Sequence, residues 1–498
     1  MASGDVFIGI DAGTTAIKAS LYDQRLTEIG AVSADTKLCN PGKGMSEIDM
    51  CGLWDSLCGI LRELKAAHGE LWPRLRGIGI SGQGDGLWAI DRDGKPARPR
   101  AIIWNDTRSR DLGIEGIPGL EDLLRREWAN TIYTGSMPAL QKWLKKNERD
   151  TYDRIYRSLH CKDWLNFRLT GEAVSDFSDI TCSSGMNLRT LRYIPEVFRL
   201  LDIEEMLPTM PRGVEPSDII GRVSRSAAEA AGLPEGTAVI AGSIDCSAVS
   251  AGTDFYNRGE GCTIIGTALI NEVCLGPDEV NPDDLRGYLL YHVIKGRYIK
   301  MMGTKSGTSS VDYFKNLLCP GEDLGKLDAE IEKIPVGSNG LVFHPYLYGE
   351  RAPFNNPYAF SSMFGIRSDH SRYELARAAY EGLAMSFYDC YQDLPKIELL
   401  YLTGGASRSP VICRMYCDVI GLPVRRQTNR ELGTLGIVKM LLVKLGYAGG
   451  YEDIRSDSFV EYEPDMDRHR QYRDLYEKFV SYRNSVAPYW TPDPHKAP

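Results

Sequence analysis

The sequence has little of what membrane and nucleic-acid proteins need. No apolar run approaches the ~20 residues that span a bilayer, and the N-terminus lacks the charged-then-apolar pattern of a secretory signal. No basic run stands out, and the net charge of -9 with a pI near 5.5 opposes binding to a phosphate backbone. We therefore expect a cytoplasmic protein that binds neither nucleic acid nor membrane.

The sequence also lacks a dense cysteine framework and the usual metal motifs. Its 12 cysteines are scattered singly, and its 7 histidines form no HExxH motif, which is typical of a reducing compartment. Cys413 and Cys417 are four residues apart and would share one face of a helix. No CxxC or nearby histidine completes a ligand set, so we interpret the pair as core residues.

The common Walker-type phosphate loop is absent as well. GxxxxGK[ST] does not occur, and the close-set glycines of "SGQGDG" (residues 81–86) do not have the spacing of a dinucleotide loop. Any nucleotide must therefore bind by another architecture. The chain has 498 residues, which is too long for one ordinary core, so we predict two large domains.

The N-terminal segment carries the first candidate anion site. Two predicted strands cover residues 7–10 and 16–22. The small-residue turn between them exposes backbone N–H groups, Thr14 and Thr15 add hydroxyl donors, and Lys18 adds positive charge. Asp11 beside phosphates implies a Mg²⁺ ion between them. The alternative is an ordinary hairpin with a surface lysine.

A similar pattern recurs in the middle of the chain. Residues 238–252 predict a strand, a Gly-Ser turn and a helix, and residues 262–273 predict a strand, a Gly-Thr turn and a strand. We interpret this as a weak internal duplication, with two related domains that meet near residue 250. Asp245, at the change from strand to helix, is a candidate general base for an attacking hydroxyl. A helix N-cap is its alternative role.

Polar side chains also follow two other predicted strands, where α/β proteins place ligands. They are Gln83, Asp85, Asn105, Asp106 and Arg108. They could hydrogen-bond a polyhydroxylated ligand, and the alternative is simple loop solvation. Residues 401–410 ("YLTGGASRSP") predict a strand that enters a small-residue turn. Glycines there let a flat base or ribose approach the backbone, and the alternative is a plain strand-to-helix turn.

Two helices are predicted in the C-terminal part. Ser371 and Glu374 form a capping box, and an apolar stripe follows at three- and four-residue steps. The stripe consists of Leu375, Ala379, Leu383, Phe387, Cys390 and Leu394. The second helix carries Tyr472, Leu475, Phe479 and Tyr482 at similar spacing. We predict that it docks on the core and that the proline-rich tail after Trp490 is loose.

Together these motifs resemble the FGGY family of carbohydrate kinases, from Ile8 to about Gly446. The most specific element is "SSMFGIRSDHSRYELARAAYEG", and "CKDWLNFRLTGEAVSDFSD" (residues 161–179) is similar to the family's central segment. The positions that fit the C-terminal signature are Ser361, Met363, Gly365, Ile366, Glu374, Leu375, Ala378, Ala379, Tyr380 and Glu381. The resemblance implies an α/β fold of two actin-like (ribonuclease H-like) ATPase domains with a cleft between them. The implied domains are residues 1–250 and 251–446, with a helical extension and loose tail over 447–498.

The resemblance also assigns the site residues. It implies a first phosphate site at Asp11, Gly13, Thr14, Thr15 and Lys18, and a second at Gly266 and Thr267. It implies an adenosine site at Gly307, Gly404, Gly405, Ala406 and Ser409. Asp245 matches the catalytic base, and it would share Mg²⁺ with Asp11. The implied sugar pocket contains Gln83, Gly84, Asp85, Trp104 and Asp106, together with Asp245.

Some positions depart from the family pattern. Leu140 replaces a usual lysine, Thr308 replaces a glycine of many relatives, and Gly135 stands where glycerol kinases have a tyrosine on the substrate. "QGDG" (residues 83–86) is most similar to erythritol kinases, whereas "PYLYGERA" and "KSGTSSVDYF" are similar to L-xylulose kinases. A small open-chain polyol or ketose fits a short anionic acceptor such as Asp85.

We therefore expect ATP- and Mg²⁺-dependent phosphorylation of a terminal hydroxyl of a four- or five-carbon polyol or ketopentose, such as erythritol or L-xylulose. The alternatives are a D-xylulose, D-ribulose or glycerol kinase and, from another class, a non-catalytic sugar-sensing protein on the actin fold. The expected partner is the small sugar or polyol, and a homodimer is the expected form of any self-association.

Overall fold

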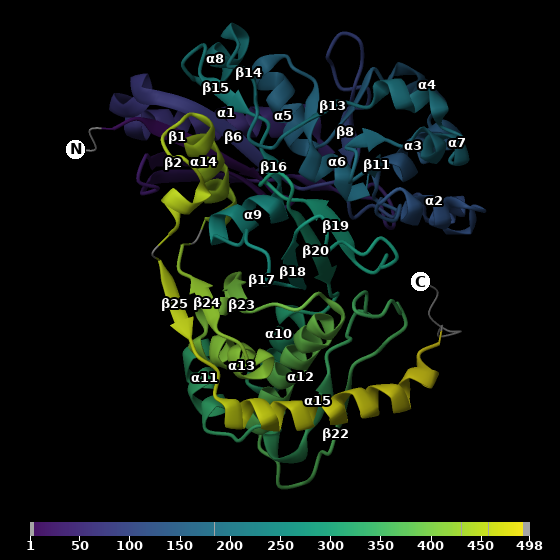
Figure 1. Cartoon of the computed structure of the whole chain (residues 1–498), viewed down its shortest axis with the longest axis vertical. Helices are drawn as coiled ribbons and strands as arrows, with labels where there is room; N and C mark the ends of the chain where they lie inside the picture. Colours follow the sequence, from purple (N-terminus) through teal and green to yellow (C-terminus); the bar gives the residue numbers. More distant parts are fainter. Residues whose placement is uncertain (1–3, 184, 430, 457, 492–498) are drawn as a thin grey trace. The chain divides into compact units, whose positions relative to one another are not determined.

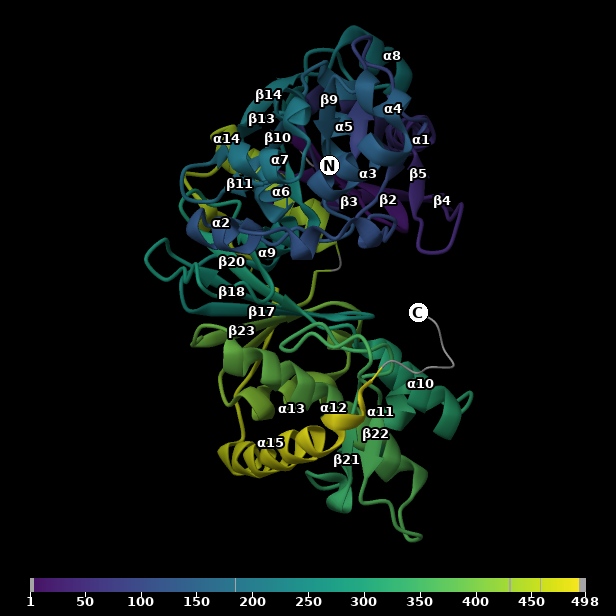
Figure 2. The same ribbon diagram turned by 90° about the vertical axis from the view of Figure 1, so that its right-hand side faces the viewer.

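The computed structural model describes residues 4–183, 185–429, 431–456 and 458–491, and the chain divides into two compact units (Figure 1 and Figure 2). Unit 1 comprises Met1–Tyr256, Gly276–Ile299 and Arg430–Ser456. Unit 2 comprises Asn257–Leu275, Lys300–Asn429 and Asp457–Pro498. Each unit combines a mixed β-sheet with helices, as the α/β prediction requires.

The sheet of unit 1 has the strand order β14-β15-β6-β1-β2-β3, and β16 also pairs with β6. The strands are β1 (Val6–Ala12), β2 (Ala16–Asp23), β3 (Glu28–Asp35), β6 (Leu75–Gly82), β14 (Ile219–Arg222), β15 (Ala238–Ile240) and β16 (Ser243–Ile244). β1 and β2 form the predicted antiparallel hairpin, and β6 runs parallel to β1. β1 is an almost continuous apolar run because both of its faces are covered.

Helices cover both faces of this sheet. On one face, α1 (Met50–His68) begins at Asp49, whose side chain accepts a hydrogen bond from the Gly52 N–H, and it packs on β2 and β3. On the other face, α14 (Leu432–Lys444) packs on β1, β6 and α9 (Asp245–Thr253). This approach requires glycine, because a Cβ at Gly9 would lie 2.2 Å from the Thr434 carbonyl oxygen.

Unit 2 repeats the arrangement of a hairpin beside a parallel strand. Its sheet contains the order β20-β18-β17-β23-β24-β25. These strands are β20 (Tyr298–Gly303), β18 (Leu269–Leu275), β17 (Glu260–Ile265), β23 (Leu399–Thr403), β24 (Val424–Gln427) and β25 (Phe459–Tyr462). β17 and β18 pair antiparallel and β23 runs parallel to β17, as β2, β1 and β6 do in unit 1. The predicted strand, Gly-Thr turn and strand over residues 262–273 is therefore confirmed.

The two predicted helices of unit 2 are present. α12 (Arg372–Asp393) begins with the Ser371–Glu374 capping box, and the predicted stripe is buried apart from the half-buried Leu375. α15 (Met466–Val486) buries Tyr472, Leu475 and Phe479. Tyr482 is 38% exposed, and its ring lies against that of Phe364. Among the described residues, no helix has the length and apolar character that crossing a membrane requires.

The units are discontinuous in sequence. Residues 430–456 belong to unit 1, because α14 packs on β1 and β6, whereas the sequence suggests continuous domains over residues 1–250 and 251–446. The tail that we predict to be loose lies outside the described residues from position 492 onward.

A buried ion pair joins α14 to the end of α9. Lys439 Nζ lies 2.5 Å from Asp254 Oδ1, and both side chains are almost fully buried. We expect Lys439→Ala to lower the free energy of unfolding by about 3–5 kcal/mol, because it leaves a buried carboxylate unpaired. The matched control is Lys444→Ala, which removes a half-exposed pair with Asp218 and should cost less than about 1 kcal/mol. Denaturant unfolding measures both, and equal losses would contradict the assignment.

Candidate functional site

The β1–β2 turn contains the predicted first phosphate site. The Gly13 N–H closes the turn on the Ala16 carbonyl at 3.0 Å, and Thr15 is exposed. Thr14 Oγ1 donates to Gln83 Oε1 at 3.3 Å and accepts from Trp104 Nε1 at 3.1 Å. The turn is thus connected directly to two residues that the sequence assigns to the sugar pocket.

Lys18 has a partner that sequence reasoning missed. Its ammonium lies 2.5 Å from the Glu431 carboxylate, and both side chains are 29% exposed. Glu431 directly precedes α14, and no local pattern in the sequence points across more than 400 residues to the hairpin. The Lys18 charge is therefore compensated when the protein adopts this conformation.

Asp11 and Asp245 are two carboxylates that act on each other electrostatically. Asp11 is the penultimate residue of β1, and its Oδ1 accepts a hydrogen bond from Ser81 Oγ at 2.9 Å. Asp245 is the first residue of α9, and its Oδ1 accepts from the Cys246 N–H at 2.7 Å. Burial and the nearby Asp11 carboxylate raise the pKa of Asp245 to about 7, and burial also raises the pKa of Asp11. A divalent cation with oxygen ligands fits such a pair, because it would relieve their repulsion.

The end of β6 carries two buried polar side chains with unused hydrogen-bonding atoms. Gln83 and Asp85 are 2% and 3% exposed. Asp85 Oδ2 accepts from Tyr133 Oη at 2.5 Å and from Cys182 Sγ at 3.3 Å. Among the described residues, Asp85 Oδ1 and Gln83 Nε2 have no hydrogen-bond partner. Burial raises the pKa of Asp85, and the Tyr133 hydrogen bond opposes this shift.

Gly84, between these two residues, packs against the strand that leads to Asp245. A Cβ at Gly84 would lie 2.1 Å from Ile244 Cδ1, so any larger residue there would force the Ile244 side chain to move. Sequence reasoning missed Tyr133 and Cys182, which belong to segments far from Asp85 in the sequence. Only the folded chain brings them to the Asp85 carboxylate.

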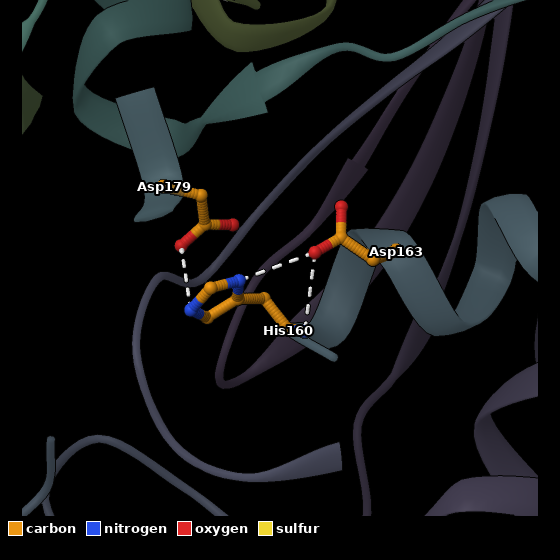
Figure 3. A group of neighbouring side chains, drawn as sticks. All are labelled: His160, Asp163 and Asp179. Carbon is orange, nitrogen blue, oxygen red and sulfur yellow. Dashed lines mark hydrogen bonds and ion pairs between the residues drawn. The ribbon is translucent and has the colours of Figure 1, made fainter. Parts of the chain in front are cut away.

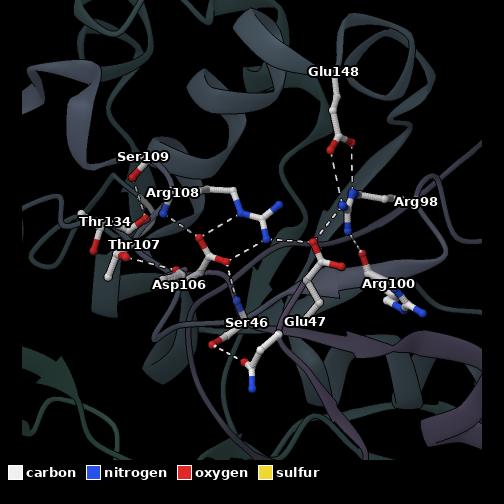
Figure 4. A network of polar contacts seen from close by, with 12 residues as sticks. Ser46, Glu47, Arg98, Arg100, Asp106, Thr107, Arg108, Ser109, Thr134 and Glu148 are labelled. Carbon is white, nitrogen blue, oxygen red and sulfur yellow. Dashed lines mark hydrogen bonds and ion pairs between the residues drawn. The ribbon is translucent and has the colours of Figure 1, made fainter. Parts of the chain in front are cut away.

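Asp106 lies in a polar network beside this region (Figure 4). Its carboxylate accepts hydrogen bonds from the Ser46 N–H and from the backbone and guanidinium of Arg108, at 2.7–2.9 Å. The Arg108 guanidinium also binds Glu47. With four donors on two fully buried oxygens, Asp106 fixes the loop that carries Trp104. Because both oxygens already accept hydrogen bonds within the protein, Asp106 is better suited to positioning this loop than to contacting a ligand directly.

Two of the three departures from the family pattern, at Gly135 and Leu140, have packing explanations. A Cβ at Gly135 would lie 1.6 Å from the Trp104 carbonyl oxygen, so the backbone leaves no room for a side chain there. Leu140 is fully buried in an apolar cluster on α3 (Met137–Asn147), where a lysine would be costly. Thr308 is the first residue of α10 (Thr308–Leu318), and its N–H donates to the Gly266 carbonyl at 2.9 Å.

In unit 2, the predicted nucleotide residues lie at strand ends. Gly266 and Thr267 form the β17–β18 turn, and a Cβ at Gly307 would meet the Gly266 carbonyl oxygen at 2.5 Å. Gly404 follows β23 with φ of 90°, and the space around Gly405 is open. The Ala406 side of this turn is half-buried.

Ser409 closes the same segment of unit 2. Its hydroxyl donates to Asp328 Oδ2 at 2.6 Å and accepts from the Ile412 N–H at 3.2 Å. It therefore caps α13 (Pro410–Ile420). In this conformation both of these hydrogen bonds occupy the Ser409 hydroxyl. A ligand would therefore reach the backbone of Gly404, Gly405 and Ala406 more easily than the Ser409 hydroxyl.

Comparison with known proteins identifies the class of the chain. Residues 6–252 match the N-terminal domain of the FGGY family of carbohydrate kinases, and residues 266–445 match its C-terminal domain. The chain therefore belongs to the FGGY family of carbohydrate kinases, and it is a phosphotransferase. The two-domain α/β fold is the fold of these sugar kinases and agrees with the predicted actin-like class.

Named relatives span almost the whole chain. Erythritol kinase from Brucella abortus is 28% identical over 98% of this chain and 97% of its own length. A probable L-xylulose kinase from Pasteurella multocida is 27% identical over 95% of this chain and 97% of its own. The crystal structure of a xylulose kinase from Rhodospirillum rubrum superposes with a TM-score of 0.89, at 26% identity and over 97% of this chain and 99% of that one. The family implies ATP as the phosphoryl donor and a sugar or polyol as the acceptor.

The contact of Gly135 with the Trp104 carbonyl gives a stability prediction. We expect Gly135→Ala to lower the free energy of unfolding by about 1–3 kcal/mol, because the added methyl must displace the backbone beside Trp104. Gly116→Ala is the matched control, since nothing lies within 4 Å of its Cβ position. Denaturant unfolding compares the two variants, and an unchanged Gly135→Ala would contradict the close packing.

Proposed function

We propose that the chain transfers the γ-phosphoryl group of ATP to a terminal hydroxyl of a four- or five-carbon polyol or ketopentose, with erythritol or an L-xylulose-like sugar as the best candidates. The observation that carries this proposal is the pair of unused atoms at the end of β6. Gln83 Nε2 is a donor and Asp85 Oδ1 an acceptor, and both are buried without a partner among the described residues.

A polyol matches these two atoms because each hydroxyl both donates and accepts a hydrogen bond. A buried polar group left unpaired costs roughly 1–3 kcal/mol, and a ligand hydroxyl that pairs with it removes this cost. The same cost penalises analogues that lack the hydroxyl, so recognition should be selective. Trp104, 38% exposed, would add a flat apolar surface beside the sugar, and Asp106 would hold that loop.

In this proposal, Asp245 is the general base. A neutral alcohol is a weak nucleophile, so the Asp245 carboxylate takes the hydroxyl proton as the new O–P bond forms and the bond between the γ-phosphorus and the β–γ bridging oxygen breaks. The Cys246 N–H binds one carboxylate oxygen and so orients the group. ADP and the phosphorylated sugar are the products.

The nucleotide contacts are proposed for each unit separately. In unit 1, Asp11 and Asp245 would hold Mg²⁺, which neutralises phosphate charge when bound, while Gly13, Thr14, Thr15 and Lys18 bind phosphates. Lys18 would exchange Glu431 for a phosphate oxygen. In unit 2, Gly266 and Thr267 would bind phosphates and Gly307, Gly404, Gly405, Ala406 and Ser409 the adenosine. The open space at Gly405 supports this assignment.

The competing functions are a kinase for D-xylulose, D-ribulose or glycerol, and a non-catalytic sugar sensor. Gly135 has no room for the tyrosine of glycerol kinases, which disfavours glycerol. The named relatives include an erythritol kinase, a probable L-xylulose kinase and a xylulose kinase, so the acceptor must be found by assay.

The test is ADP release with Mg·ATP in a coupled assay against erythritol, L-xylulose, D-xylulose, D-ribulose, xylitol and glycerol. We expect strong turnover on one acceptor, and a loss of about 100-fold or more in kcat for Asp245→Asn, because general-base catalysis contributes about 10²–10⁴-fold. Asp218→Asn, at a half-exposed ion pair in the same unit, is the control and should retain activity. Sugar binding without ADP release would favour the sensor.

The hydrogen bond from Tyr133 to Asp85 gives a prediction about acceptor recognition. We expect Tyr133→Phe to raise KM for the preferred acceptor about tenfold, because the Asp85 carboxylate loses the donor that orients it, at ~1–2 kcal/mol. KM for ATP should not change. Tyr193→Phe is the matched control, since its half-buried hydroxyl donates to the Pro211 carbonyl. Steady-state kinetics with varied acceptor and varied ATP measure both KM values. The same KM for the acceptor in Tyr133→Phe and Tyr193→Phe would contradict the assignment.

A further inference from the structure

A cluster of buried charged groups lies behind the proposed sugar pocket. It consists of His160, Lys162, Asp163, Asp176 and Asp179, each at most 1% exposed. Lys162 Nζ lies 2.5 Å from Asp163, 2.7 Å from Asp176 and 3.4 Å from Asp179. Buried ion pairs often stabilise a fold no better than apolar residues of the same volume. Stability alone is therefore a weak explanation for five such groups in one place.

Three members of the cluster resemble a metal site (Figure 3). His160, Asp163 and Asp179 place ligand atoms within 4.8 Å of one another, and His160 contacts both carboxylates. The Lys162 ammonium, however, already pairs with both of these carboxylates. The Lys162 ammonium thus supplies the positive charge that a metal ion would supply. The contacts between the cluster and the neighbouring residues explain it better than metal binding does.

One branch of the cluster leads to the residue before the proposed catalytic base. Asp176, at the end of β10 (Val174–Asp176), accepts hydrogen bonds through Oδ2 from the backbone N–H and the hydroxyl of Ser178. Ser178 Oγ in turn accepts the Ile244 N–H at 3.0 Å. Lys162, Asp176, Ser178 and Ile244 therefore form one continuous chain of buried contacts that ends beside Asp245.

Ile244 has two roles at the site. It pairs with Gly82 at the end of β6, and its side chain fills the space where a Cβ of Gly84 would be. Its position thus affects the segment with Gln83 and Asp85 as well as Asp245. A shift of about 1 Å in a reacting group can cost about 100-fold in rate.

We propose that Asp176 and Ser178, anchored by Lys162, are positioning residues that hold Ile244 and through it the Asp245 carboxylate in the geometry needed for phosphoryl transfer. This inference rests on the proposed function for its kinetic consequence. Their hydrogen-bonded link to the site runs through the Ile244 N–H, so they act through Ile244.

Kinetics of Ser178→Ala test the proposal, with Ser175→Ala as the matched control. Ser175 is a buried serine beside this cluster, and its hydroxyl contacts His160, whereas the Ile244 N–H bonds to Ser178. We expect kcat of Ser178→Ala to fall about tenfold or more, with KM for ATP and for the acceptor changed less than about twofold. Ser175→Ala should keep kcat within about twofold. Equal losses in both variants, or a change confined to KM or to thermal stability, would overturn the proposal.

A second variant examines the chain as a unit. Asp176→Asn keeps the shape of the side chain and removes its charge. We expect the double variant Asp176→Asn/Ser178→Ala to have a kcat within about twofold of the slower single variant. If the two losses in kcat multiply in the double variant, Asp176 and Ser178 act independently. That result would overturn the proposed series of contacts from Asp176 through Ser178 to Ile244. If Asp176→Asn does not fold, the Ser178 and Ser175 comparison decides alone.

Hydrogen exchange provides a test that needs no activity. Ser178→Ala removes the acceptor of the Ile244 N–H, so we expect faster exchange in a peptide covering residues 240–250, and unchanged exchange there in Ser175→Ala. Wild-type protein without turnover on any acceptor would refute the proposed kinase function. The exchange experiment would still decide the structural link, and equal exchange in wild type and Ser178→Ala would overturn it.

Discussion

The parallel pairing of β6 with β1 on one side and β16 on the other is the constraint on which the site in unit 1 depends. Parallel strands end at the same edge of a sheet, so Asp11 near the end of β1, Gln83 and Asp85 after β6, and Asp245 after β16 are brought together. The β1–β2 hairpin then adds Thr14, whose hydroxyl contacts both Gln83 and Trp104. Proposed phosphate and sugar contacts are therefore linked through one side chain.

The strand ends can come so close only because particular residues are small. Gly9 admits α14 against β1, Gly84 admits Ile244, and Gly135 admits the Trp104 backbone. In each case an added methyl group would overlap a neighbouring atom, so a residue larger than glycine would disturb the packing. The buried ion pair of Lys439 with Asp254 then holds α14 to α9, the helix that begins with Asp245.

The buried carboxylates of unit 1 differ in how many of their oxygens accept hydrogen bonds. Asp106 uses both oxygens on four donors, which suits a structural anchor. Asp85 uses one oxygen and leaves the other without a partner among the described residues, which suits a ligand contact. The count of hydrogen bonds therefore distinguishes two carboxylates that the sequence presents as equivalent.

The sequence by itself determined the local elements and the family. Alternating and continuous apolar runs predicted the β1–β2 and β17–β18 hairpins, the capping box predicted α12, and the ordered motifs identified an FGGY carbohydrate kinase. These features depend on neighbours in the chain. Tertiary structure alone decided that Glu431 pairs with Lys18, that Tyr133 and Cys182 bind Asp85, and that Ser178 holds Ile244. It also placed α14 in unit 1 and left Tyr482 exposed. These contacts join residues distant in sequence, and their geometry is fixed only when the sheets and helices pack.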